Sequence, residues 1–340
     1  MSSLRAGKLP PEMLERLLSR IEVRDPRVLL GPKVGEDAAL IDFGDTVLAV
    51  KSDPVTFATN LIGWYAVQVN ANDIACMGAR PRWFVASLLL PEGAGPDAAG
   101  SIFDQMASAC RSLDITLVGG HTEVTYDLPR PILVGAMLGE VDKGKEVTTG
   151  GVRLGDRLVL TKGIAIEGTA LLAREATEHL ERSGVGPDAI RAAQELLFKP
   201  GISVVKEALT SCNAVEVHAL HDPTEGGLAT GIHEMASASG AGVLVREARV
   251  RILPETAILC KALKLHPLGL LASGALLIAV AAEDLHRLLA ALRAAGVDAE
   301  EIGEAVPVEE GVSFLTTQGT RKPLPRFERD ELARFFAPGE

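Results

Sequence analysis

The first part of the chain alternates between helical and strand spacing of apolar residues. Leu14, Leu17 and Leu18 recur at helical spacing and predict a short opening helix. Two apolar runs, 38–43 and 46–52, flank Gly44-Asp45 and predict a hairpin. The remaining elements predicted up to residue 141 are helices at 64–77 and 97–113 and strands at 84–90, 115–118 and 131–141. This alternation predicts an α/β domain.

A second unit is expected to follow residues 148–151, where Thr-Thr-Gly-Gly interrupts the pattern. We therefore predict an N-terminal domain at 1–150, a C-terminal domain at 151–310 and a peripheral tail at 311–340 with one short helix. The elements predicted after the boundary are strands at 157–161, 215–220, 242–245 and 275–280 and helices at 169–176, 188–197, 202–209, 227–238 and 284–295.

Composition narrows the class of protein. The 340 residues suffice for two domains, and 47% hydrophobic with 23% charged residues is typical of a globular protein. A net charge of −11 argues against a nucleic-acid-binding surface. The four cysteines are widely spaced, without a C-x-x-C pair, so neither a disulfide framework nor a thiolate zinc site is expected. The charged N-terminal stretch and the lack of a long apolar run predict a cytoplasmic protein, without a membrane partner.

Four separated aspartates stand among small residues, at Asp37, Asp53, Asp73 and Asp222. Carboxylates in such settings suit Mg²⁺, which binds few protein oxygens and leaves room for phosphate oxygens. Asp37 precedes one hairpin strand and Asp53 is expected just past the end of the other, so antiparallel pairing brings them together. For Asp37 or Asp53 alone, turn chemistry is the favoured explanation, and for Asp73 alone it is a position on a helix surface. Their succession before a glycine loop favours metal ligands.

Asp73 occupies an apolar helical stretch beside Asn72. A buried carboxylate there needs a partner, because an unpaired buried charge is costly. Cys76 lies on the same stretch, without a neighbouring His or helix N-terminus to lower its pKa, and is expected to be a buried structural residue.

Two glycine pairs are candidate sites for an anionic ligand. Gly226-Gly227 opens a predicted helix, where bare N–H groups and the positive end of the helix dipole attract anions. Gly119-Gly120 follows the strand predicted at 115–118, and a strand end would let a ligand approach the backbone. His121, Thr122 and Glu123 come next. His121 or Glu123 could touch a metal or phosphate, and Thr122 could donate a hydrogen bond. The alternative is a tight turn that carries exposed polar residues, and this motif alone does not decide between them.

A zinc site at His218 and His221 is not expected. On a strand, residues three apart point to opposite faces, so these two side chains are poorly placed to share a metal.

At these motifs the chain resembles the PurM superfamily, which includes aminoimidazole ribonucleotide synthetase, thiamine-monophosphate kinase, selenophosphate synthetase and the hydrogenase maturation protein HypE. The motifs are Gly-Glu-Asp-Ala-Ala at 35–39, Asn-Asp-Ile-Ala-x-Met-Gly-Ala-x-Pro at 72–81, Gly-Gly-His-Thr at 119–122 and Asp-x-Thr-x-Gly-Gly-Leu at 222–228. The resemblance implies two α/β (α+β) domains and a homodimer whose N-terminal mixed sheets pair into a barrel. It also implies ATP with Mg²⁺ held by the four aspartates, and a role for Asn72 and the glycine motifs in nucleotide binding.

The form of the motifs is most similar to HypE, which uses ATP to dehydrate a carbamoyl group on its own C-terminal cysteine. Here the last cysteine is Cys260, and Gly274 follows Ala-Ser where HypE-like chains tend to carry Glu. His121 stands where the kinase branch tends to have Asp. The carrier thiol is therefore not expected in this chain.

Two classes of function follow from these observations. The first is an ATP-dependent enzyme that activates an oxygen of an unidentified small substrate by phosphoryl transfer, HypE-like or similar to thiamine-monophosphate kinase. The second is a nucleotide-binding maturation or partner protein with little turnover. Fold-level likeness alone does not separate the two classes.

Overall fold

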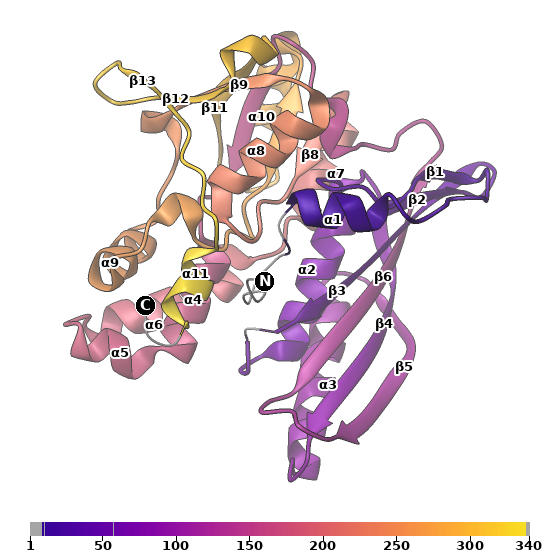
Figure 1. Cartoon of the computed structure of the whole chain (residues 1–340), viewed down its shortest axis with the longest axis vertical. Coiled ribbons are helices and arrows are strands. Elements are labelled where there is room, and N and C mark those ends of the chain that lie inside the picture. Colours follow the sequence, from indigo (N-terminus) through magenta and orange to yellow (C-terminus); the bar gives the residue numbers. More distant parts are fainter. Residues whose placement is uncertain (1–8, 10, 57, 338–340) are drawn as a thin grey trace. The chain divides into compact units, whose positions relative to one another are not determined.

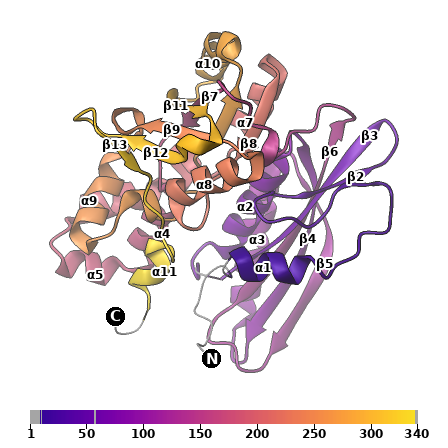
Figure 2. The ribbon, with the colours of Figure 1, turned by 45° about the horizontal axis from the view of Figure 1, so that its top comes forward.

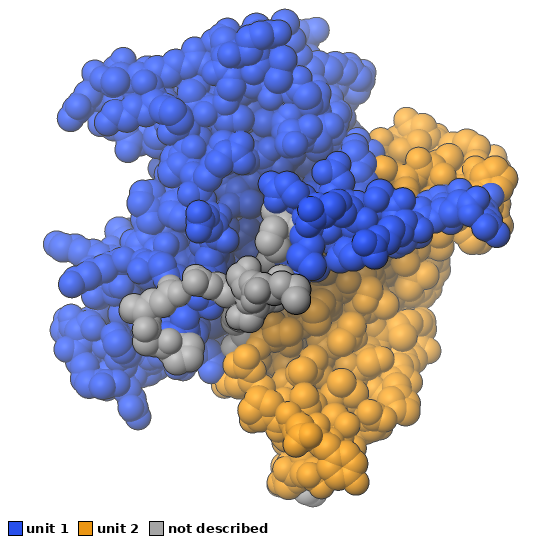
Figure 3. Space-filling view, viewed as in Figure 1, with its two compact units in different colours: residues 1–24, 32–36, 147–340 blue, residues 25–31, 37–146 orange. Residues whose placement is uncertain are grey.

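Unit 2, residues 25–31 and 37–146, is built on a mixed sheet in which the structure describes six strands (Figures 1 and 3). The order is β1-β2-β3-β6-β4-β5, and only the β4–β5 pair is parallel. The strands are β1 (Val28–Leu30), β2 (Ala39–Asp42), β3 (Thr46–Val55), β4 (Arg80–Pro91), β5 (Thr116–Thr125) and β6 (Ile132–Asp142). The predicted hairpin is confirmed, because β2 pairs with β3 across Gly44-Asp45.

Helix α2 (Ile62–Cys76) explains why one face of this sheet is buried. Nearly all its residues are buried, including Tyr65, Ile74 and Asp73. Both α2 and α3 (Pro96–Ser112) lie along the sheet, and α3 connects the parallel strands β4 and β5 as the crossover of a βαβ unit (Figure 2). Gly63 allows the two helices to approach closely, since a Cβ there would lie 2.5 Å from the Ile102 carbonyl oxygen.

Unit 1, residues 1–24, 32–36 and 147–340, contains a second mixed sheet in its described part. The order of its seven strands is β13-β12-β9-β11-β7-β10-β8. They are β7 (Arg157–Thr161), β8 (Val217–His221), β9 (Gly242–Arg246), β10 (Leu277–Val280), β11 (Ala299–Val306), β12 (Val312–Leu315) and β13 (Arg321–Pro323). Strand β10 is buried at every position, as expected for a strand covered on both faces.

Five helices of unit 1 differ in what they pack against. Helix α8 packs on the sheet through Leu228, Ile232 and Met235, which share a core with Val243 and Leu277. Helices α4, α5, α6 and α9 pack against one another. The bounds are α1 (Pro11–Leu18), α4 (Ile166–Glu175), α5 (Thr177–Arg182), α6 (Pro187–Glu195), α7 (Val205–Ala214), α8 (Gly227–Ser239), α9 (Pro254–Leu263), α10 (Leu285–Ala294) and α11 (Glu331–Phe335).

In the segment expected as a peripheral tail, 311–340, the described residues up to 337 belong to unit 1. Strand β12 pairs in parallel with β9, and Leu324 and Leu332 are almost fully buried. Strand β11 and helix α9, which the sequence pattern did not predict, complete the unit.

The structure is a computed structural model that describes residues 9, 11–56 and 58–337. The expectation about the N-terminal stretch concerns residues 1–8, which lie outside that part. Among the described residues, no helix combines the length and the apolar character that a membrane span needs.

Candidate functional site

A lysine and two predicted metal ligands meet in unit 2. Lys51 and Asp53 are two residues apart on β3 and therefore share a face of the sheet. The Lys51 Nζ lies 3.4 Å from Asp53 Oδ2 and 3.2 Å from Asp73 Oδ2. Asp73 comes from α2, and its side chain is 7% exposed. The partner that a buried Asp73 was expected to need is therefore Lys51.

Asp37 adds a third carboxylate to this group. It lies just before β2, and the pairing of Ala39 with Val50 carries Asp37 towards the Lys51–Asp53 segment. Burial lowers the pKa of Lys51, but the carboxylates of Asp73, Asp53 and Asp37 outweigh burial and raise it above its ordinary value. Lys51 is therefore charged. We refer to Asp37, Lys51, Asp53 and Asp73 as the Lys51 cluster.

Asn70 fixes the backbone of β3 beside the Lys51 cluster. The Asp53 N–H donates to Asn70 Oδ1 at 2.9 Å, and the Asn70 amide donates to the carbonyls of Asp53 and Ala66 at 3.3 and 2.8 Å. Strand β3 continues through Asp53 to Val55, so the expectation that Asp53 stands just past the strand end is wrong. The long pairing of β3 with β6 extends the strand further than its own sequence indicates.

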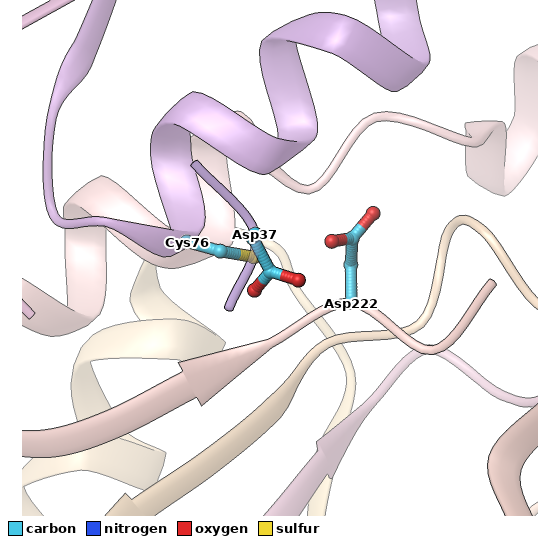
Figure 4. Close-up of side chains that lie close together, drawn as sticks. All are labelled: Asp37, Cys76 and Asp222. Carbon is cyan, nitrogen blue, oxygen red and sulfur yellow. The ribbon is translucent and has the colours of Figure 1, made fainter. Parts of the chain in front are cut away.

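The donor set of the Lys51 cluster fits Mg²⁺. Three carboxylates face one ammonium group, which leaves a formal charge of −2. As whole residues, Asp37 and Asp73 are 8% and 5% exposed, and carboxylate oxygens are the ligands that a hard divalent cation prefers. Cys76 is buried as expected, with its Sγ within 4.8 Å of an Asp37 carboxylate oxygen (Figure 4). A soft thiol suits this cation poorly.

The glycine motif at 119–122 has a different setting from the one predicted. Gly119, Gly120 and Thr122 lie inside β5, paired with Val85, Ala86 and Leu88 of β4, so the expected strand end at residue 118 is wrong. A Cβ on Gly120 would lie 2.0 Å from the Ala86 carbonyl oxygen, so close packing of the two strands requires this glycine.

The polar side chains of β5 are exposed, and the nearest partner of His121 is Glu123, with His121 Nε2 3.2 Å from Glu123 Oε2. The glycine at position 120 is therefore explained by the close packing of β5 against β4. Asn72, the remaining candidate from the same half of the chain, is fully buried in α2.

The turn 222–227 of unit 1 joins β8 to α8 with two left-handed glycines. Gly226 and Gly227 have φ values of 80° and 65°. A Cβ on Gly227 would lie 2.5 Å from the Leu268 carbonyl oxygen. Asp222 projects from this turn directly after β8 and is 1% exposed (Figure 4). Residues 222–227 are called the α8 turn below.

A carboxylate already lies at the N-terminus of α8. The Gly226 N–H donates to Asp330 Oδ2 at 2.6 Å, and the Leu332 N–H donates to Asp330 Oδ1 at 2.7 Å. The α8 turn therefore receives an anionic oxygen in the way that glycine amides receive phosphate. Sequence reasoning missed Asp330, because it is distant in the chain and lies in the expected tail.

Two acidic side chains of unit 1 have strongly shifted pKa values. Burial raises the pKa of Glu167, in the first turn of α4, to about 7, and the carboxylates of Asp330 and Glu225 act in the same direction. Burial also raises the pKa of Asp330 to about 7, in spite of the hydrogen bonds from Gly226 and Leu332, which lower it. Each carboxyl therefore takes up a proton near neutral pH.

The two histidines of the His-x-x-His motif have separate partners. His218 Nδ1 lies 2.9 Å from Asp156 Oδ1, whereas His221 Nε2 lies 3.1 Å from Glu234 Oε2. The two rings therefore have different hydrogen-bond partners.

The thiols of unit 1 and of α3 are protonated at neutral pH. Burial raises the pKa of Cys110 and Cys212 to about 11 and that of Cys260 to about 12. A thiolate nucleophile needs the opposite shift.

Comparison with known proteins identifies the family. Residues 35–141 match the family model described as AIR synthase related protein, N-terminal domain, and residues 153–315 match its C-terminal domain. A putative hydrogenase expression/formation protein of Methanocaldococcus jannaschii is 30% identical, over 94% of this chain and 96% of that protein. The carbamoyl dehydratase HypE of Cupriavidus necator is 32% identical, over 77% of this chain and 72% of that protein.

A solved structure shares the fold. The crystal structure of a hydrogenase maturation protein HypE in complex with ATP has a TM-score of 0.69 and 25% sequence identity, over 97% of this chain and 98% of that one. The two-domain PurM-like fold expected from the motifs is thus confirmed. The chain belongs to the AIR synthase related protein family.

Proposed function

We propose that this protein is a Mg²⁺-dependent ATP-binding enzyme of the PurM/HypE type, which activates an oxygen of a small substrate by phosphoryl transfer. The observation that carries the proposal is the Lys51 cluster, where three carboxylates converge on one ammonium group inside the N-terminal family domain. The HypE structure solved with ATP supports the choice of nucleotide.

Asp37, Asp53 and Asp73 of the Lys51 cluster are proposed metal ligands. Asp222, on the α8 turn, is likewise a proposed metal ligand. These carboxylates would hold Mg²⁺, which would supply neutralisation of charge on the phosphates and the leaving group, while most of the acceleration in such reactions comes from positioning. Lys51 would hold the carboxylates together before the metal binds and could afterwards pair with a phosphate oxygen.

The α8 turn is the proposed phosphate-binding element of unit 1. Its Gly226 amide already donates to the Asp330 carboxyl group, which supports the proposal that an acidic oxygen of a ligand can be received there. Asn72 and the β5 residues Gly119, Gly120 and Thr122 are further proposed nucleotide-binding positions. Of these, Gly120 has an independent structural reason, the close approach of β4.

The proposed acceptor is a small molecule rather than a thiol of the described chain. Cys110, Cys212 and Cys260 have raised pKa values, and Cys76 is buried in α2. A thiol that remains protonated at neutral pH is a poor acceptor for an activated group.

The test replaces Asp73 by asparagine and measures ADP formation against Mg²⁺ concentration. Because changes to residues that only support a metal ligand cost about 10- to 100-fold in affinity or activity, loss of a direct ligand is expected to lower turnover at least ~100-fold. Asp104→Asn, on the exposed surface of α3, is the matched control and keeps wild-type turnover. Circular dichroism checks that both variants fold. Unchanged Mg²⁺-dependent turnover in Asp73→Asn would contradict the proposal.

A second candidate is a nucleotide-binding partner protein with little turnover. The favouring observation is that Lys51 itself supplies a positive charge between Asp53 and Asp73, so the carboxylates are held together without a metal. This candidate predicts saturable ATP binding by calorimetry without ADP release over hours. Robust ADP formation by the purified protein would exclude it.

We also propose that the protein forms a homodimer through unit 2. Strand β5 is an edge strand whose residues are mostly exposed, including Val118 at 54% and Val124 at 59%. An exposed edge with apolar side chains invites pairing with another chain. Light scattering at twice the chain mass of 35.8 kDa would support the dimer, and a monomer at micromolar concentration would argue against it.

A further inference from the structure

The segment 330–335 occupies the N-terminus of α8 with its own carboxylate. Both glycine amides of the α8 turn have acceptors: the Gly226 N–H donates to Asp330 Oδ2 at 2.6 Å, and the Gly227 N–H donates to the Thr224 carbonyl at 3.0 Å. An anionic ligand could therefore take the Gly226 amide only by displacing Asp330.

Contacts beyond Asp330 hold this segment in place. Glu331 Oε2 accepts from the His266 N–H at 2.8 Å, and Arg334 donates to Glu331 at 2.6 Å and to the Lys264 carbonyl at 2.9 Å. Leu332 is 1% exposed, so α11 also buries apolar surface. The docked state is thus a defined packing arrangement that must be undone for Gly226 to be released.

The charged groups that face Asp330 make its ionised form costly. Glu225 belongs to the α8 turn itself, and Glu167 belongs to the first turn of α4; both are acidic. The backbone hydrogen bonds that Asp330 receives from Gly226, Leu332 and Leu271 offset only part of this cost. A ligand phosphate that arrives with its own divalent cation would not meet the same repulsion, because the cation neutralises part of its charge.

We propose that Asp330 is an internal competitor for the anion-binding end of α8, so that segment 330–335 is an autoinhibitory latch that opens when a polyphosphate binds. The latch rests on the proposed function in one respect, that the α8 turn binds the ligand's phosphate. It adds that binding there requires release of the Asp330 carboxylate, and that the released segment becomes accessible to solvent.

The first test is calorimetry of Asp330→Ala with ATP–Mg²⁺ and, separately, with inorganic triphosphate and Mg²⁺. Loss of one competing hydrogen bond to a charged group should tighten binding about tenfold relative to wild type. Glu328→Ala, a nearby exposed carboxylate, is the matched control and leaves the dissociation constant unchanged. Unchanged or weaker binding by Asp330→Ala would overturn the latch.

The second test uses wild-type protein and so does not depend on how a variant folds. Amide hydrogen exchange of residues 331–335 should rise when triphosphate and Mg²⁺ saturate the protein, because α11 is released. Constant or slower exchange at saturation contradicts the latch.

The two probes separate the latch from the proposed function. Tighter triphosphate binding by Asp330→Ala without any binding of ATP would support the latch and refute ATP as the ligand. Binding of ATP with equal affinity in wild type and variant would support the proposed nucleotide and refute the latch. Absence of binding of either probe to both proteins refutes the latch as well.

Discussion

Replacing Glu167 by glutamine is expected to change how stability depends on pH. Glu167 is 7% exposed, and burial, with the carboxylates of Asp330 and Glu225, raises its pKa from 4.5 to about 7. Each pKa unit corresponds to about 1.36 kcal/mol, so a shift of roughly 2.5 units is equivalent to about 3 kcal/mol of unfolding free energy.

The sign follows from proton uptake. Since the pKa is raised in the folded state, the folded protein binds more protons than the unfolded chain between pH 4.5 and about 7. The contribution of Glu167 to stability is therefore largest at low pH and falls as the pH rises through this window. Glutamine has no such dependence. Relative to wild type, the variant should gain about 3 kcal/mol between pH 4.5 and pH 8.

The assay is urea unfolding followed by far-ultraviolet circular dichroism at pH 4.5, 6, 7 and 8. Both tryptophans, Trp64 and Trp83, belong to unit 2, so their fluorescence reports separately on that unit. Glu178→Gln, on the exposed side of α5, is the matched control and should follow the wild-type curve. The reasoning is refuted when the difference in unfolding free energy between Glu167→Gln and wild type is the same at pH 4.5 and pH 8.

Two further substitutions test the Lys51 cluster and the packing of β5 against β4. In Lys51→Met the carboxylates lose their internal cation, so Mg²⁺ should raise the melting temperature more than in wild type; equal shifts in a thermal titration would argue against a metal at the cluster. In Gly120→Ala the new Cβ would meet the Ala86 carbonyl oxygen at 2.0 Å, which should cost roughly 1–3 kcal/mol or more. Gly119→Ala, whose Cβ meets nothing within 4 Å, should be far milder; equal losses in urea unfolding would show that the contact is unimportant.

The pattern of apolar residues and glycines was sufficient to predict those elements that depend on their own residues alone. The β2–β3 hairpin follows from two apolar runs around Gly44-Asp45, and α8 follows from Gly226-Gly227 and the apolar residues after it. The requirement for a partner at Asp73 also follows from local sequence, because a carboxylate in an apolar helix is costly by itself.

Strand β11 shows why some elements were not predicted from the pattern of apolar residues. Glu301 and Glu304 interrupt its apolar alternation and argue against a central strand. In the structure they pair with Arg157 of β7 and Arg246 of β9, the two strands on either side. The stability of these charges depends on cross-strand neighbours that are distant in sequence.

The sequence by itself determined the two-domain α/β class, the family motifs and the set of acidic residues, because these depend on residue type and short spacing. Only the tertiary structure decided that Lys51 joins the three aspartates, that β5 continues through Gly120, and that Asp330 reaches Gly226. The physical reason is that packing brings together side chains and backbone groups separated by tens of residues, and the energies of charge pairing, close strand contact and helix-end hydrogen bonding depend on that proximity.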